Sequence, residues 1–204
     1  MYLLVYNIFI NFLFSMFFGR YINKQYLLYL TVFNFFLSIL SSFFIFYNCL
    51  LLGEVVTINS FYWFDVLLFN VEWSFIFNPF SSIMFIVVLL VSFNSHLYSF
   101  EYMEEDPFIH VFISYLSLFT FFMLLLVSSN SLIQLFIGWE GVGLCSYLLI
   151  NYWSTRILAN KAAMMAVIAN RIGDIFLMTA IIMLFFIFKT TNTETIYFLM
   201  FSFK

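Results

Sequence analysis

The sequence predicts an all-α membrane protein with about six transmembrane helices. Of its 204 residues, 65% are hydrophobic and only 8% are charged, and the mean hydropathy is +1.08. An ordinary soluble domain is about 45–50% apolar and about 25% charged. The apolar residues also fall in long blocks, which suit a lipid bilayer better than a single soluble core.

Six apolar blocks qualify as spanning helices, because about 20 residues at a rise of 1.5 Å cross ~30 Å of hydrocarbon. Pro79 favours the start of the third helix, where the missing N–H of proline costs nothing. The polar turn 128–131 predicts that the fourth and fifth helices form an antiparallel hairpin. The expected helices lie at about 3–18, 26–52, 79–98, 111–127, 132–152 and 162–188.

These elements divide the chain into four segments. The first two helices occupy 1–52, and a surface connection occupies 53–78. The remaining four helices, with all the embedded charges, occupy 79–188, and a short tail follows at 189–204. The connection alternates polar and apolar residues, which favours a small β-hairpin. Its Trp63 and Trp73 fit equally well as ordinary interfacial aromatic residues.

Charged residues orient the helices. Four basic residues, Arg20, Lys24, Arg156 and Lys161, fall in loops on one face, and the loops of the opposite face have no basic residue before Lys189. By the positive-inside rule this places both termini on the outer side of the membrane. Neither a basic run nor a nucleic-acid motif occurs, so we expect no nucleic-acid partner. Cys49 and Cys145 lie inside apolar blocks without a neighbouring cysteine, so we expect no disulfide framework and no metal site.

Three ionisable residues, Glu140, Arg171 and Asp174, fall inside predicted helices. Each costs about 2.5–3.5 kcal/mol or more if it faces lipid at a helix centre. Glu140 and Asp174 both lie ~18 Å from the basic ends of their helices, which predicts a polar layer suited to a proton path. Arg171 and Asp174, spaced i, i+3, can instead form a static intrahelical ion pair. Glu140 has no basic residue in its own helix, so it must titrate, pair across helices or contact water.

Three further residues are candidate proton relays. His96 lies near the basic end of the third helix and His110 opens the fourth. Histidine is the side chain whose ordinary pKa lies nearest neutrality, although a lone interfacial histidine commonly has no such role. Lys161, at the basic end of the sixth helix, is the third candidate.

Motifs between residues 79 and 174 resemble a known family. The most specific is GWEGVGLCSYLLI at 138–150. The others are HLYS at 96–99, EYM at 101–103, YLSLF at 115–119, NKAA at 160–163 and NRIGD at 170–174. Together they resemble subunit 5 of mitochondrial NADH:ubiquinone oxidoreductase, respiratory complex I. The resemblance implies an antiporter-like proton-pumping subunit of the distal membrane arm, in the mitochondrial inner membrane, with no redox cofactor of its own.

The resemblance also assigns roles and partners. It implies that Glu140 is the membrane-embedded glutamate of the pumping unit, and that Arg171 and Asp174 are the charged pair on the next helix. Implied partners are the other membrane-arm subunits of complex I and membrane lipids. Two alternatives remain open: a structural distal-arm subunit whose proton path is lost, and a subunit of a cation/proton antiporter complex.

This chain departs from the family in two places. The acidic residue that the family carries before its third helix would fall at 78–82, where this chain has Asn-Pro-Phe-Ser-Ser. The family also continues through further helices, including the lysine opposite the embedded glutamate. We therefore expect a second polypeptide to carry the remaining helices; a truncated or degenerate subunit is the competing interpretation.

Overall fold

The computed structural model describes residues 2–53, 55–66 and 69–202. Five of its helices are long and apolar enough to cross a membrane, and a shorter apolar helical segment covers Leu4–Phe18. The predicted all-α membrane fold with about six spans is therefore confirmed. The described helices are α1 Tyr2–Phe18, α2 Lys24–Phe46, the π-helical turn η1 Tyr47–Leu51, α3 Pro79–Tyr102, α4 Ile109–Ser128, α5 Leu132–Ile150, α6 Ile157–Phe188 and α7 Thr193–Ser202.

Two helices extend beyond their predicted bounds. The helix α3 begins at Pro79 as predicted but continues about one turn past residue 98. Its last turn is helical because Phe100 and Met103 pack in a small core with Ile109 at the start of α4. The helix α6 begins at Ile157, ahead of the predicted 162. A charged residue near a helix end does not interrupt the helix if its side chain remains exposed, and Lys161 is exposed.

The predicted β-hairpin is confirmed. Strands β1 (Val56–Val66) and β2 (Phe69–Phe77) pair antiparallel, with Val56 opposite Phe77 and two register shifts along the ladder. At the base of the hairpin, Phe75 and Phe77 join the main core cluster with residues of α1 to α4. The rings of Trp63 and Trp73 meet edge to face with centroids 5.8 Å apart. Both tryptophans are therefore strand residues of the hairpin.

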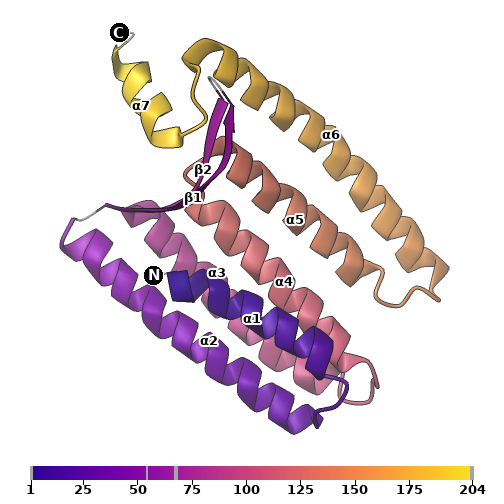
Figure 1. The fold of residues 1–204 in the computed structure, drawn as a ribbon. Coiled ribbons are helices and arrows are strands. Elements are labelled where there is room, and N and C mark those ends of the chain that lie inside the picture. The colour runs from indigo at the N-terminus through magenta and orange to yellow at the C-terminus, as the bar shows by residue number, and fades with distance from the viewer. Residues whose placement is uncertain (1, 54, 67–68, 203–204) are drawn as a thin grey trace.

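The helices α1 to α4 form one bundle, and α5 and α6 extend it on one side (Figure 1). The start of α1, the end of α2, the α4–α5 turn and α7 lie toward the hairpin, where the rings of Tyr6 and Phe75 touch. The loops around residues 19–24, 101–110 and 153 gather at the opposite end. Within the described part of the chain, α6 packs mainly on α5, so its outer face is open.

Two turns and strand β2 are joined at the hairpin end. Asn130 N, in the α4–α5 turn, donates to Ser74 O of β2 at 3.2 Å. Leu132 N donates to Thr191 O at 3.0 Å, and Thr193 N donates to Asn130 O at 2.8 Å. These bonds link the α4–α5 turn to the α6–α7 turn and give the tail a helix, α7, that the sequence did not predict. They also fix the hairpin-side ends of α5 and α6, the two helices that carry the embedded charges.

Candidate functional site

Small residues on α5 set its distance from α4. A Cβ added to Gly138 would lie 2.9 Å from the backbone of Leu126, and one added to Gly141 would lie 2.3 Å from the ring of Phe122. The glycines therefore face α4 and permit close helix contact. Because successive residues of a helix point about 100° apart, Glu140 projects away from this contact toward α6.

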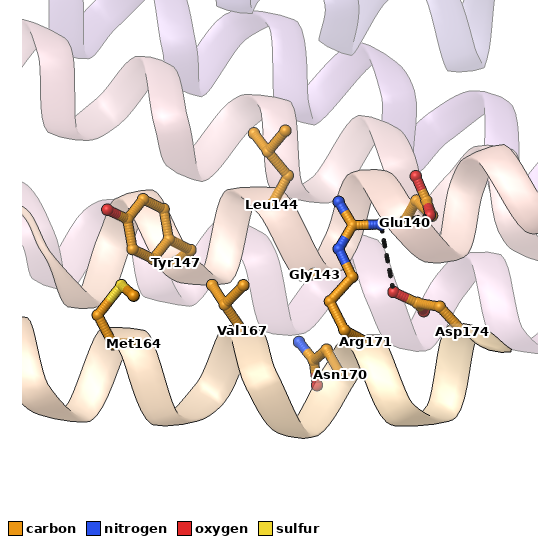
Figure 2. Close-up of a pocket in the computed structure, with 9 residues that line it drawn as sticks. All are labelled: Glu140, Gly143, Leu144, Tyr147, Met164, Val167, Asn170, Arg171 and Asp174. Atoms are coloured by element: carbon orange, nitrogen blue, oxygen red, sulfur yellow. Dashed lines mark hydrogen bonds and ion pairs between the residues drawn. The ribbon is translucent and has the colours of Figure 1, made fainter.

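The three embedded charges meet between α5 and α6. Arg171 Nη1 lies 3.0 Å from Glu140 Oε1 and 3.9 Å from Asp174 Oδ2. From the sequence alone, both an intrahelical pair of Arg171 with Asp174 and a cross-helix pair of Glu140 are open. In the structure the cross-helix pair is the shorter one. Figure 2 draws the longer contact, between Arg171 and Asp174, as a dashed line.

Trp139 is a member of this group that sequence reasoning missed. Its indole Nε1–H donates to Asp174 Oδ1 at 3.0 Å. Trp139 is about half exposed, at 48%, yet its N–H has an acceptor. Its position directly before an embedded carboxylate was a signal that could have identified it. The two oxygens of Asp174 thus have different neighbours, the indole and the guanidinium.

These charges line a cavity of about 340 Å³ between the two helices (Figure 2). The side chains of Arg171, Glu140 and Asp174 are 66%, 37% and 12% exposed. Two carboxylates and one guanidinium give the group a formal charge of −1, and an open charged group of this kind is costly against lipid. The cavity is lined by Glu140, Gly143, Leu144, Tyr147, Met164, Val167, Asn170, Arg171 and Asp174.

His96 lies in a different polar group, inside the α1–α4 bundle. Its Nδ1 is 2.7 Å from Ser92 O and its Nε2 is 3.1 Å from Ser117 Oγ. Asn11 Nδ2 donates to Ser117 Oγ at 3.0 Å, and Asn34 Nδ2 donates to Asn11 Oδ1 at 3.2 Å. A carbonyl only accepts, so Nδ1 of His96 carries the hydrogen in this arrangement. The hydrogen-bond chain connects helices α1 to α4; His96, Ser117 and Asn11 are buried, and Asn34 is partly buried.

The other two candidate relays lie toward the opposite end from the hairpin. His110 lines a cavity of about 420 Å³ with Arg20 and Lys24. Lys161 precedes Asp174 by 13 positions on α6, which is about 20 Å at 1.5 Å per residue. Neither residue lines the cavity of Glu140 and Arg171, and the relay roles of His96, His110 and Lys161 stay predictions.

The chemistry available at the α5–α6 cavity is proton exchange. Among the described residues, no three His, Cys, Asp or Glu side chains gather in an arrangement that could hold a metal ion. Carboxylates exchange protons with water, whereas the guanidinium of arginine stays charged at any pH that a protein experiences. Of the two carboxylates in the cavity, Glu140 is the more accessible, with 37% of its side chain exposed against 12% for Asp174.

Comparison with known proteins places the chain in a family. The family model described as NADH-ubiquinone oxidoreductase (complex I), chain 5 N-terminus, matches residues 63–113. The model described as NADH:quinone oxidoreductase/Mrp antiporter, TM, matches residues 129–203. The second match includes all the residues of the charged group between α5 and α6.

Individual relatives agree with these matches. NADH-ubiquinone oxidoreductase chain 5 of Acanthamoeba castellanii is 44% identical over 92% of this chain and 28% of its own length. NADH-quinone oxidoreductase subunit L of Rickettsia bellii (strain RML369-C) is 44% identical over 89% of this chain and 28% of its own length. This chain therefore spans about a quarter of the length of these relatives.

A solved structure has the same fold. The membrane-bound sulfane sulfur reductase, an archaeal respiratory membrane complex, contains a chain that matches with a TM-score of 0.81 and 19% identity. The match covers 95% of this chain and 38% of the other. Together with the sequence relatives, the comparisons show that this chain belongs to the family of antiporter-like membrane subunits that includes complex I chain 5 and subunit L, and that it corresponds to an N-terminal portion of them.

Proposed function

We propose that this chain takes part in proton translocation by the membrane arm of a respiratory NADH:ubiquinone oxidoreductase, and that Glu140 is its proton-exchanging group. The observation that carries the proposal is the ion pair of 3.0 Å between Glu140 on α5 and Arg171 on α6, inside a cavity within two membrane-spanning helices. An embedded carboxylate with a cationic partner is the arrangement expected of a membrane proton path.

The mechanism follows from the charge of the cavity. With Glu140 ionised, the group carries a formal charge of −1, so a further cation nearby favours the ionised carboxylate. When that cation withdraws, proton uptake by Glu140 becomes more favourable. We infer that a lysine from outside this chain supplies this cation, and that redox changes elsewhere in the complex move it.

The partners follow from the exposure of α6. Its outer face is open, and the side chain of Arg171 is 66% exposed. Arginine facing lipid at mid-membrane is costly, so we infer that further membrane helices cover α6. We propose that a second polypeptide of the same complex carries these helices and the lysine, alongside the other membrane-arm subunits and lipids.

We propose the mitochondrial inner membrane as the location, with the hairpin end and both termini on the intermembrane-space side. The basic loops then face the matrix, in agreement with the positive-inside rule. In this proposal the redox centres lie in other subunits. Recovery of this chain with complex I subunits and a lysine-bearing multi-helix chain, by native gel electrophoresis and mass spectrometry, supports the assignment; recovery without redox subunits contradicts it.

Replacement of Glu140 by glutamine tests the proton-exchange role. Glu140→Gln keeps the shape of the side chain and removes its ability to ionise, so we expect the complex to assemble while proton translocation per NADH oxidised falls. Assembly is checked on native gels, and translocation is measured with a pH-sensitive dye in vesicles containing the whole complex. Wild-type translocation in both Glu140→Gln and Asp174→Asn would instead favour a purely structural subunit.

A cation/proton antiporter complex is the second candidate, because one matching family model includes Mrp antiporters. The same embedded acidic group would serve both functions. Transport assays separate the candidates: a Na⁺ or K⁺ gradient that drives proton movement without NADH favours the antiporter, and strict dependence on NADH oxidation excludes it.

A further inference from the structure

Trp139 connects α5 to the carboxylate of Asp174 on α6. The indole Nε1–H donates to Oδ1 at 3.0 Å, whereas Oδ2 lies 3.9 Å from Arg171 Nη1. An indole has one donor, no acceptor and no charge to exchange. It can therefore fix the orientation of the carboxyl group, with Oδ2 directed to Arg171, but it cannot carry a proton itself.

A single nitrogen of Arg171 lies between the two carboxylates. Nη1 is 3.0 Å from Glu140 Oε1, within the ordinary range for a hydrogen bond, and 3.9 Å from Asp174 Oδ2, outside it. A movement of about 1 Å would exchange one partner for the other. The guanidinium is thus bonded to Glu140 and close to a second acceptor that is already oriented.

We infer that Trp139 is a positioning residue that keeps Asp174 ready to receive Arg171 whenever Glu140 takes up a proton. The inference rests on the proposed function, because it assigns a role within the same proton-exchange cycle. The transferred proton adds to a carboxylate oxygen of Glu140 from water in the cavity, and the O–H bond to Glu140 forms as one O–H bond of hydrated H₃O⁺ breaks. Arg171 keeps all its own protons.

Charge balance explains why the second acceptor is needed. Protonation of Glu140 removes the partner of Arg171, and an uncompensated cation inside membrane-spanning helices is unfavourable. With Asp174 held in place, Arg171 closes on Oδ2 and the group becomes neutral. Without the indole, the carboxyl group of Asp174 can turn toward the open cavity, and Arg171 then remains on Glu140 and opposes its protonation.

The test is Trp139→Phe, which keeps an aromatic ring and removes the N–H. In vesicles containing the whole complex, we expect proton translocation per NADH to fall roughly three- to tenfold at neutral pH, an effect comparable to the loss of one hydrogen bond. The pH profile should also move to lower pH, because Glu140 is then harder to protonate. Trp153→Phe is the matched control, since Trp153 stacks with Arg156 outside the cavity.

A double substitution separates positioning from general packing. If Trp139 acts through Asp174, then Trp139→Phe combined with Asp174→Asn is expected to be no worse than Asp174→Asn alone. Independent, multiplying effects would overturn the inference, as would a wild-type pH profile in Trp139→Phe. If Trp139→Phe does not assemble, Asp174→Glu is the second variant, because it displaces the carboxylate from the indole. A pH profile of translocation that shifts to lower pH in Asp174→Glu supports the inference, and an unshifted profile overturns it.

Glu140→Gln distinguishes this inference from the function on which it rests. Loss of translocation in Glu140→Gln together with a wild-type profile in Trp139→Phe rejects the role of Trp139 and leaves the proposed function intact. Normal translocation in Glu140→Gln rejects the proposed function itself.

Discussion

Replacing Gly138 with alanine is expected to force α4 and α5 apart. The added Cβ would lie 2.9 Å from Leu126 N, Cα and Cβ. Backbone atoms cannot rotate out of the way, so an ordinary carbon contact of 3.5–4.0 Å requires the helices to separate by roughly 0.6–1.1 Å. Glu140 lies two residues further along α5 and moves with it. The distance of 3.0 Å between Glu140 Oε1 and Arg171 Nη1 is therefore expected to change.

The free energy of this change has two opposing parts. Overpacking costs about 1–3 kcal/mol, whereas alanine in place of glycine inside a helix gains about 1 kcal/mol. Gly173 on α6 offers a matched control, because among the described residues a Cβ built there meets nothing within 4 Å beyond its chain neighbours and the backbone of its own helix. The helix gain is common to both variants, so Gly138→Ala should be less stable than Gly173→Ala by about 1–3 kcal/mol.

Heating the assembled complex in mild detergent measures the difference. Retention of this chain is followed on native gels as temperature rises. Since about 1 kcal/mol corresponds to ~2–4 °C for a chain of this size, Gly138→Ala should dissociate several degrees below Gly173→Ala. Equal midpoints for the two variants would refute the packing argument.

Two further predictions use the same heating assay. Asn11→Leu is expected to destabilise the α1–α4 bundle by about 1–2 kcal/mol, because Ser117 loses a donor and Asn34 loses an acceptor. The control is Asn94→Leu, since Asn94 is exposed. Equal losses of stability in the two variants would contradict a stabilising role for the hydrogen bonds of Asn11. Ser131→Ala should cost about 1 kcal/mol, because Ser131 Oγ accepts an N–H of the first turn of α5. Because Ser131 is fully buried, the control is Ser131→Thr, which keeps a capping hydroxyl and adds no charge. It should lose less than Ser131→Ala, so equal or larger losses would contradict capping.

Helix positions were predictable from the sequence and helix ends were less so. The length of an apolar block and the rise per residue fix where a span lies. The ends depend on tertiary contacts: the last turn of α3 is held by the packing of Phe100 and Met103 against Ile109, and α7 by bonds from Thr193 to Asn130. Such long-range contacts leave no periodic signal in the local sequence.

The three charged residues of the site were predictable, but their pairing and the contact with Trp139 were not. Glu140 and Asp174 lie at about the same distance from the basic ends of their helices, so they lie at the same depth in the membrane whatever the details of packing. The choice of partner for Arg171 depends on the rotation of α5 about its axis, which the glycine contacts with α4 set. The role of Trp139 required the same information, because only this rotation brings its N–H within 3.0 Å of Asp174.

The two polar groups inside the described bundle differ in a way that bears on function. The members of the chain formed by His96, Ser117, Asn11 and Asn34 bond to one another, and all but Asn34, which is partly buried, are buried. Such a network stabilises helix packing without an outside partner. The group around Glu140 carries a formal charge of −1 and opens on the exposed face of α6. A charged, open group within membrane-spanning helices needs a further cation and neighbouring helices that shield it from lipid. The His96 network has no such requirement, and for this reason we expect proton exchange at the α5–α6 cavity.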